Sequence, residues 1–123
     1  MPLSLAALFL DLSGVLYEGE RAIAGAGELV NRARQRGLVL RFVTNTASRG
    51  RQAILARLES MGISVMETEL FTAPIAAKRY IQQQKLRPFC LVHEAIRDEF
   101  ADLAQQDPNC VLLGDARDGL HYQ

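Results

Sequence analysis

A single carboxylate at the end of an apolar run is the first residue in this sequence that could do chemistry. The run at positions 8–10 leads into Asp11, and a small turn containing Ser13 and Gly14 follows. Uninterrupted apolar strands are typical of parallel sheets, and ligands bind at the carboxyl edge of such sheets. The pattern therefore predicts Asp11 at that edge, where its carboxylate can act as a nucleophile. The alternative is a plain turn or capping residue.

A second polar cluster, Thr44-Asn45-Thr46, follows the apolar run at 38–43. If the two runs are parallel strands joined by a helix, their carboxyl ends share one edge of a sheet. Thr44, Asn45 and the amides of a helix starting near Ser48 then face Asp11. Such donors hold phosphate oxygens, the helix dipole favours their negative charge, and the carboxylate can attack phosphorus. An ordinary strand-to-helix cap is the alternative for this cluster.

The elements that must position these residues alternate between strand and helix. Leu29, Val30 and Ala33 mark the buried face of the first helix, and Ser48 is expected to cap the second. This alternation predicts an α/β fold with right-handed crossovers. We expect strands at 5–10, 38–43, 89–92 and 111–113, and helices at 25–36, 49–60, 74–84 and 94–104.

Composition narrows the class of protein. The chain has 123 residues, the size of one domain, and its 14 basic and 14 acidic residues give a formal net charge of zero. Nucleic acid and anionic membranes are therefore disfavoured as partners. Cys90 and Cys110 lie beside apolar runs, which favours buried thiols over a disulfide or a metal pair. The apolar stretch before Asp11 lacks a basic leader, so we expect no signal peptide, no membrane span and a cytoplasmic location.

The segments 11–17 and 41–46 resemble the haloacid dehalogenase superfamily, and within it the class IIA branch. Its members end the first strand in Asp-x-Asp-Gly and the second in Ser or Thr. The resemblance implies a Rossmann-like parallel-sheet core and a Mg²⁺-dependent phosphatase acting on a small phosphorylated substrate. It makes Asp11 the nucleophile that forms an aspartyl-phosphate, and it assigns Mg²⁺ to the Asp11 carboxylate and the Ser13 main-chain carbonyl. Thr44 and Asn45 would bind the phosphoryl oxygens.

One departure from the family pattern concerns the acid catalyst. Most family phosphatases carry Asp two residues after the nucleophile, where this chain has Ser13. A hydroxyl is a poor acid near neutral pH, and general acid–base assistance contributes roughly 10²–10⁴-fold in rate. We therefore expect substrates whose leaving groups need little help, namely phosphoramidates, pyrophosphate or aryl phosphates.

The second departure concerns the lysine and the later acidic motif of the family. No Gly-Lys-Pro occurs here, and the nearest acidic pair is Asp115 and Asp118, with Lys78 or Lys85 upstream. A compact enzyme using these residues is one alternative. The favoured interpretation is a truncated chain, with 1–71 from the catalytic core and 72–123 from the first part of an α/β cap, divided at a soft boundary. Half a sheet leaves an apolar face open, so such a chain should be poorly stable or associate, for example as a homodimer.

A non-catalytic function is the remaining alternative. The chain could be an incomplete relative retained as an α/β binding module, or a receiver-like phosphoacceptor that uses the same strand-end Asp11. A receiver should show an acidic pair close to its first strand, and none precedes Asp11. The loss of Mg²⁺-dependent phosphate release in an Asp11→Asn variant would separate an enzyme from a binder.

Overall fold

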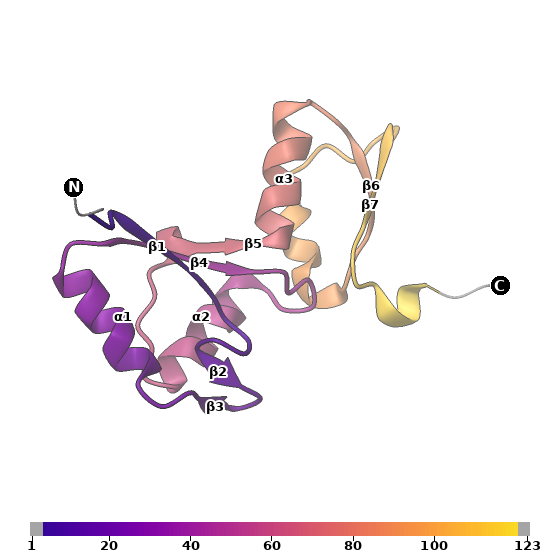
Figure 1. Cartoon of the computed structure of the whole chain (residues 1–123). Coiled ribbons are helices and arrows are strands. Elements are labelled where there is room, and N and C mark those ends of the chain that lie inside the picture. Colours follow the sequence, from indigo (N-terminus) through magenta and orange to yellow (C-terminus); the bar gives the residue numbers. More distant parts are fainter. Residues whose placement is uncertain (1–3, 121–123) are drawn as a thin grey trace. The chain divides into compact units, whose positions relative to one another are not determined.

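A computed structural model describes residues 4–120, apart from the side chain of Asp118, and shows an α/β fold (Figure 1). The strands are β1 (Ala7–Asp11), β2 (Tyr17–Glu18), β3 (Arg21–Ala22), β4 (Val39–Thr44), β5 (Leu70–Thr72), β6 (Pro88–Leu91) and β7 (Cys110–Leu113). The α-helices are α1 (Ala26–Gln35), α2 (Arg51–Ser60) and α3 (Ala73–Gln83). Short 3₁₀ helices are η1 (Glu67–Glu69), η2 (Glu94–Phe100) and η3 (Arg117–Gly119).

The chain folds into two compact units that are discontinuous in sequence. One unit comprises Met1–Thr44 and Arg51–Phe71, and the other comprises Asn45–Gly50 and Thr72–Gln123. The backbone therefore passes from one unit to the other at three peptide bonds. That the first unit is part of a catalytic core, and the second the start of a cap, stays a prediction.

The first unit is built on a three-stranded sheet in the order β1-β4-β5. β1 and β4 are parallel, in a register that pairs Ala7 with Val39 and Asp11 with Val43. The helix α1 connects these two strands, as the alternating pattern predicts. Along β4 the side chains alternate strictly, with Leu40, Phe42 and Thr44 buried and their neighbours exposed. The two faces of the sheet therefore have different surroundings.

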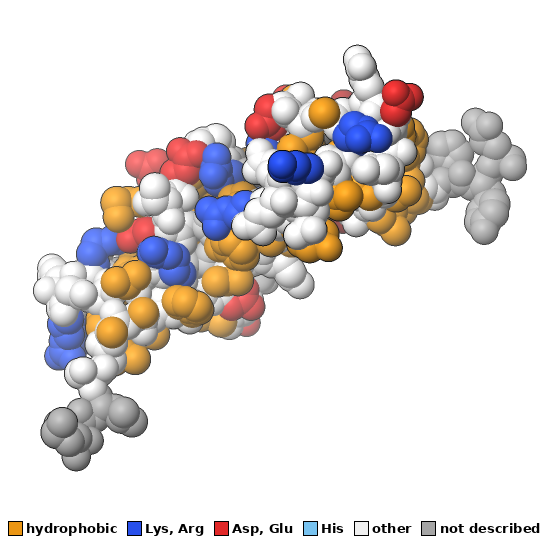
Figure 2. Space-filling view, turned by 90° about the horizontal axis from the view of Figure 1, so that it is seen from above, with side chains coloured by type: hydrophobic (Ala, Val, Ile, Leu, Met, Phe, Trp, Pro, Cys, Tyr) orange, Lys and Arg blue, Asp and Glu red, His pale blue; other side chains and the backbone are white. Residues whose placement is uncertain are grey.

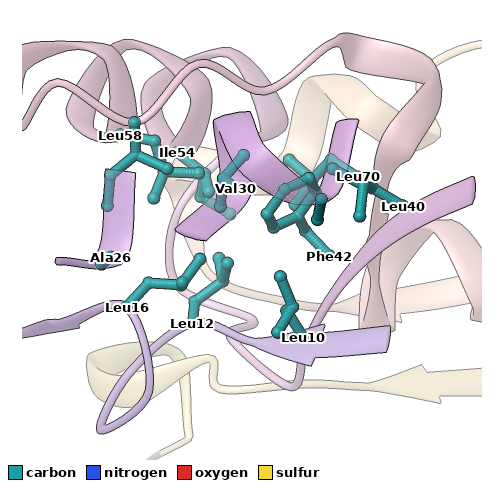
Figure 3. Close-up of a cluster of buried hydrophobic side chains, with 12 residues drawn as sticks. Leu10, Leu12, Leu16, Ala26, Val30, Leu40, Phe42, Ile54, Leu58 and Leu70 are labelled. Carbon is teal, nitrogen blue, oxygen red and sulfur yellow. The ribbon is translucent and has the colours of Figure 1, made fainter. Parts of the chain in front are cut away.

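The core of the first unit lies on the face of the sheet covered by α1 and α2 (Figure 3). Leu12 and Leu16, from the loop after β1, are also buried in it. Each large side chain buried in this way contributes about 1.5–3 kcal/mol to folding, so the cluster fixes the loop as well as the sheet. The members from strands are Leu10, Leu40, Phe42 and Leu70, and those from helices are Ala26, Val30, Ala33, Ile54 and Leu58.

The opposite face of the same sheet, which we call the bare face, exposes apolar side chains and Arg41 within the described part of the chain. Phe9 is 72% exposed, Val39 49% and Val43 37%. Hydrophobic side chains are visible at the surface in Figure 2, interspersed with Lys and Arg side chains. Parallel sheets ordinarily have both faces covered, so this exposed apolar surface is unusual for the fold.

The second unit carries the parallel pair β6 and β7, in a register that joins Pro88 to Cys110. Val92, Ile96 and Phe100 form its buried cluster, with Cys90 and Leu112 packed against them. The hydroxyl of Thr72 accepts a hydrogen bond from the Ile75 amide at 3.3 Å and so caps α3. No helix within residues 4–120 is long and apolar enough to cross a membrane.

Three sequence-based expectations require correction. Leu29, predicted on the buried face of α1, is 50% exposed, because the buried positions are Ala26, Val30 and Ala33. α2 begins at Arg51, so Ser48 does not directly precede it. The helix expected at 94–104 is the 3₁₀ helix η2, which ends at Phe100.

Candidate active site

Asp11 is the last residue of β1, and its side chain is exposed at the carboxyl end of that strand. Its Oδ1 accepts a hydrogen bond from the amide of Leu12 at 2.8 Å. This bond holds one carboxylate oxygen against the backbone. The position matches the prediction from the apolar run.

The loop after Asp11 is compact and tightly hydrogen-bonded. The carbonyl of Leu12 accepts the amides of Val15 and Leu16 at 3.2 and 2.8 Å, and Gly14 donates to the Tyr17 carbonyl at 2.8 Å. Gly14 has φ of +81°, a left-handed conformation that side chains other than glycine disfavour. The glycine of the motif is therefore required by the turn, which fixes where the Ser13 carbonyl lies relative to Asp11.

Thr44 lies at the carboxyl end of the neighbouring strand. Asp11 pairs with Val43, so Thr44 is one position beyond it on the adjacent parallel strand. Its side chain is 6% exposed. The structure thus brings Asp11 and Thr44 to one edge of one sheet, as their strand-end positions predict.

Asn45 follows Thr44 directly in the chain but belongs to the second unit, with Ser48. Its side chain is exposed. A contribution of Asn45, or of the amides near Ser48, to phosphate binding stays a prediction.

A hairpin that the sequence patterns do not reveal follows the Asp11 loop. β2 and β3 are antiparallel and pair Tyr17 with Ala22 and Glu18 with Arg21. Gly19, with φ of +54°, occupies the first central position of the two-residue turn, where glycine is favoured. Strands of two residues are too short for hydrophobic periodicity to indicate them. Only the Glu-Gly-Glu turn composition could have signalled the hairpin.

The oxygens at this edge are of the kind that Mg²⁺ prefers, since a carboxylate and a main-chain carbonyl are hard donors. Asp11 and Ser13 provide them from one short loop. Mg²⁺ usually keeps several waters, so a site with few protein ligands fits its chemistry. Among the described residues no group of three or more His, Cys, Asp or Glu side chains gathers into a metal-binding cluster. The donors present therefore fit part of a magnesium site.

Two residues of the compact-enzyme alternative, Lys78 and Asp115, have other partners, and the side chain of Asp118 lies outside the described part of the structure. Lys78 Nζ contacts Asp102 Oδ1 at 2.6 Å within the second unit. The hydrogen bond from Lys78 is the main cause that lowers the pKa of the Asp102 carboxyl below its usual value. Asp115 Oδ2 accepts from Arg117 Nε at 3.4 Å. Lys78 is thus engaged with a carboxylate on its own unit.

The two cysteines are free thiols on the neighbouring strands β6 and β7, and both are half-buried rather than fully buried. Burial, followed by the proximity of Cys110, raises the pKa of the Cys90 thiol above its usual value. A raised pKa keeps the thiol protonated and weakly reactive near neutral pH. This fits a packing role better than a catalytic one.

Comparison with known proteins places these features in a family. Residues 8–106 match the sequence model of a family described as Haloacid dehalogenase-like hydrolase. The phospholysine phosphohistidine inorganic pyrophosphate phosphatase of Xenopus laevis is 41% identical over 122 residues, which cover 95% of this chain and 45% of that protein. The chain therefore spans about half the length of the curated relatives it matches.

Solved structures agree with this assignment of the fold. The p-nitrophenyl phosphatase from Archaeoglobus fulgidus is 30% identical with a TM-score of 0.67, over 74% of this chain and 36% of that one. The glycerol phosphate phosphatase from Mycobacterium tuberculosis, in complex with magnesium, is 25% identical with a TM-score of 0.72, over 86% of this chain and 35% of that one. In both cases the matched region is part of a longer chain.

Proposed function

The chain belongs to the haloacid dehalogenase-like hydrolase family, and from this premise we propose that it supplies the nucleophile and phosphate-binding half of a Mg²⁺-dependent phosphatase. The observation that carries the proposal is the position of Asp11 and Thr44 at the ends of adjacent parallel strands. This edge is where α/β sheets bind ligands. A nucleophilic carboxylate and a hydroxyl donor at the same edge of a sheet suit phosphoryl transfer.

The proposed reaction has two steps. Asp11 Oδ2 attacks phosphorus, and the bond to the leaving group breaks as that group departs with the bonding electrons and gains a proton from water. The product on the enzyme is an aspartyl-phosphate. Water then attacks the phosphorus, and the acyl-phosphate P–O bond breaks to restore the Asp11 carboxylate and release inorganic phosphate. The hydrogen bond from the Leu12 amide to Oδ1 orients the carboxylate for the first step.

Asp11 and the Ser13 carbonyl would hold the metal ion, with waters completing its coordination. When bound, Mg²⁺ neutralises negative charge on the phosphoryl oxygens. Thr44 and Asn45 would donate to those oxygens and fix their orientation.

Substrates with good leaving groups fit the chemistry of Ser13, which cannot donate a proton as a carboxylic acid can. The names of two similar proteins support this, since phospholysine, phosphohistidine, pyrophosphate and p-nitrophenyl phosphate all carry such leaving groups. Glycerol phosphate, in the name of a third, is an alkyl ester, so the family also includes enzymes for poorer leaving groups. We propose that this chain acts on substrates with good leaving groups rather than on alkyl esters.

Because this chain lacks the family's Gly-Lys-Pro lysine, the test uses the chain extended by the half that its relatives possess. It measures phosphate release from p-nitrophenyl phosphate, pyrophosphate and a phosphoramidate, with and without Mg²⁺. We expect release that needs Mg²⁺ and is lost in Asp11→Asn, which removes the nucleophile but keeps its size. Asp98→Asn, at an exposed position on η2, is the matched control and should retain activity. Equal activity in Asp11→Asn and the parent would reject the mechanism.

Two further variants separate the alternatives. Loss of activity in Asp115→Asn would favour the compact enzyme, in which that acid is a metal ligand. A chain extended by the half that its relatives possess, if still inactive on all three substrates, would reject the enzyme and favour the binding module.

A further inference from the structure

We infer that Arg57 is a positioning residue, which clamps the hairpin β2–β3 against α2 and thereby holds the Asp11 loop in its working geometry. The inference deepens the proposed function and rests on it for its catalytic consequence. Its structural part rests only on contacts within the first unit.

Arg57 reaches the hairpin through three different interactions. Its guanidinium carbon lies 4.9 Å from the centre of the Tyr17 ring, in the geometry of a cation–π contact. One terminal nitrogen donates to the Gly19 carbonyl, and the same nitrogen lies 3.0 Å from Glu20 Oε1. A single side chain of α2 therefore contacts the first strand of the hairpin and both residues of its turn.

The environment of Arg57 argues for more than a surface ion pair. Its side chain is only 15% exposed, whereas that of Glu20 is 81% exposed. Its Nε is buried without a hydrogen-bond partner among the described residues. Burying an unpartnered N–H is unfavourable, and an apolar side chain would avoid that penalty. We therefore infer that the contacts of the guanidinium with the hairpin offset the cost of burying it.

The hairpin is connected to the Asp11 loop by backbone hydrogen bonds. The amide of Gly14 donates to the Tyr17 carbonyl at 2.8 Å, and Ser13 forms a β-bridge with Tyr17. The amide of Ile23 donates to the Leu16 carbonyl at 2.9 Å. Movement of Tyr17 would therefore move Ser13, whose carbonyl is the proposed Mg²⁺ ligand. Arg57 acts on the site through this connection and does not itself contact the reacting atoms.

The first test needs neither metal nor substrate. In Arg57→Met, which keeps the apolar length of the side chain, hydrogen exchange of the Gly14 and Ile23 amides should become roughly tenfold faster, because an ionic hydrogen bond and a cation–π contact are lost. Arg51→Met, on the same helix, breaks the ion pair with Glu67 and should leave these two amides unchanged. Unchanged exchange in Arg57→Met would overturn the inference.

A second pair of variants guards against a folding defect in Arg57→Met. Glu20→Gln and Tyr17→Leu remove the partners from the hairpin side, so a double-mutant cycle with Arg57→Met should show coupling in the Gly14 exchange rate. Additive effects in both cycles would mean that the side chains do not act together, which contradicts the clamp.

The third readout is the Mg²⁺ concentration that gives half-maximal phosphate release. A variant that merely unfolds in part loses active protein without a change in this midpoint. Displacement of the Ser13 carbonyl should raise it severalfold in Arg57→Met, with partial recovery in Arg57→Lys, which keeps the charge beside Glu20. An unchanged midpoint would overturn the catalytic consequence. An inactive extended chain, together with accelerated Gly14 exchange in Arg57→Met, would reject the proposed function and keep the clamp.

Discussion

At the scale of single residues, the chemistry of the site depends on the two residues Ser13 and Gly14 in the turn after Asp11. Ser13 occupies the position where most family phosphatases have their acid, and the left-handed Gly14 fixes the turn that holds it. The loop therefore keeps the turn of the motif, but Ser13 cannot donate a proton to the leaving group as the family's Asp can. This combination restricts which leaving groups can depart unaided.

Replacing Ser13 by Asp should restore that capacity. We expect Ser13→Asp to gain roughly 10²-fold or more in kcat/KM on alkyl phosphates, the lower end of what general acid catalysis contributes. Activity on p-nitrophenyl phosphate should change much less, because its leaving group needs no proton. Ser13→Asn, of similar size but without an acidic proton, is the control and should gain nothing. A parent chain that already prefers alkyl esters would contradict the explanation.

At the scale of elements, α1 is tied to the segment before β5 by a largely buried ion pair. Arg34 Nη2 lies 2.7 Å from Glu69 Oε2, and the side chain of Glu69 is 8% exposed while that of Arg34 is 33% exposed. The same oxygen accepts the Met66 amide at 3.0 Å, and Arg34 also donates to the Ser64 carbonyl at 3.2 Å. These bonds hold η1 in place immediately before the third strand of the sheet.

Removing Arg34 should therefore destabilise the fold strongly. Arg34→Met leaves the Glu69 carboxylate buried without its cation, and breaking such a pair lowers the free energy of unfolding by about 3 kcal/mol. Arg51→Met, which breaks a more exposed pair with Glu67, should lower it by only about 0.5 kcal/mol. Urea unfolding followed by circular dichroism gives both values. Equal losses in the two variants would show that burial of Glu69 is not what matters.

Sequence patterns predict the elements whose hydrophobic residues recur over several positions. β1, β4 and α1 are recovered within two residues, and with them the edge that carries Asp11 and Thr44. The short β5 and the hairpin β2–β3 are missed, because two or three residues show no period. Arg57 is missed for a related reason: its partners in the hairpin lie far from it in sequence, so no spacing joins them.

At the scale of the whole molecule, we expect the bare face of the first sheet to govern whether the chain associates in solution. Phe9, Val39 and Val43 expose apolar surface on a parallel sheet, and β1 and β5 are its unpaired edges. Such surfaces favour association. The second unit adds exposed Phe89, Val111 and Leu113 on its own strands.

We expect the 123-residue chain to associate as its concentration rises. Phe9→Lys should weaken this association, because it replaces a 72% exposed apolar side chain by a second positive charge next to Arg41. Asn31→Lys introduces the same charge at an exposed position of α1 and should have little effect. Light scattering over a range of concentrations measures both. A monodisperse parent monomer, or equal effects of the two lysines, would contradict this role for the face.

The three crossings of the backbone between the units constrain anyone who recombines this protein with its relatives. A single junction at Phe71 would transplant Thr72–Gln123 but leave Asn45–Gly50, which belongs to the same unit, behind. A chimaera that keeps each unit intact needs junctions after Thr44, Gly50 and Phe71. In such a chimaera, Asn45–Gly50 must come from the same parent as Thr72–Gln123, and not from the parent that supplies β4.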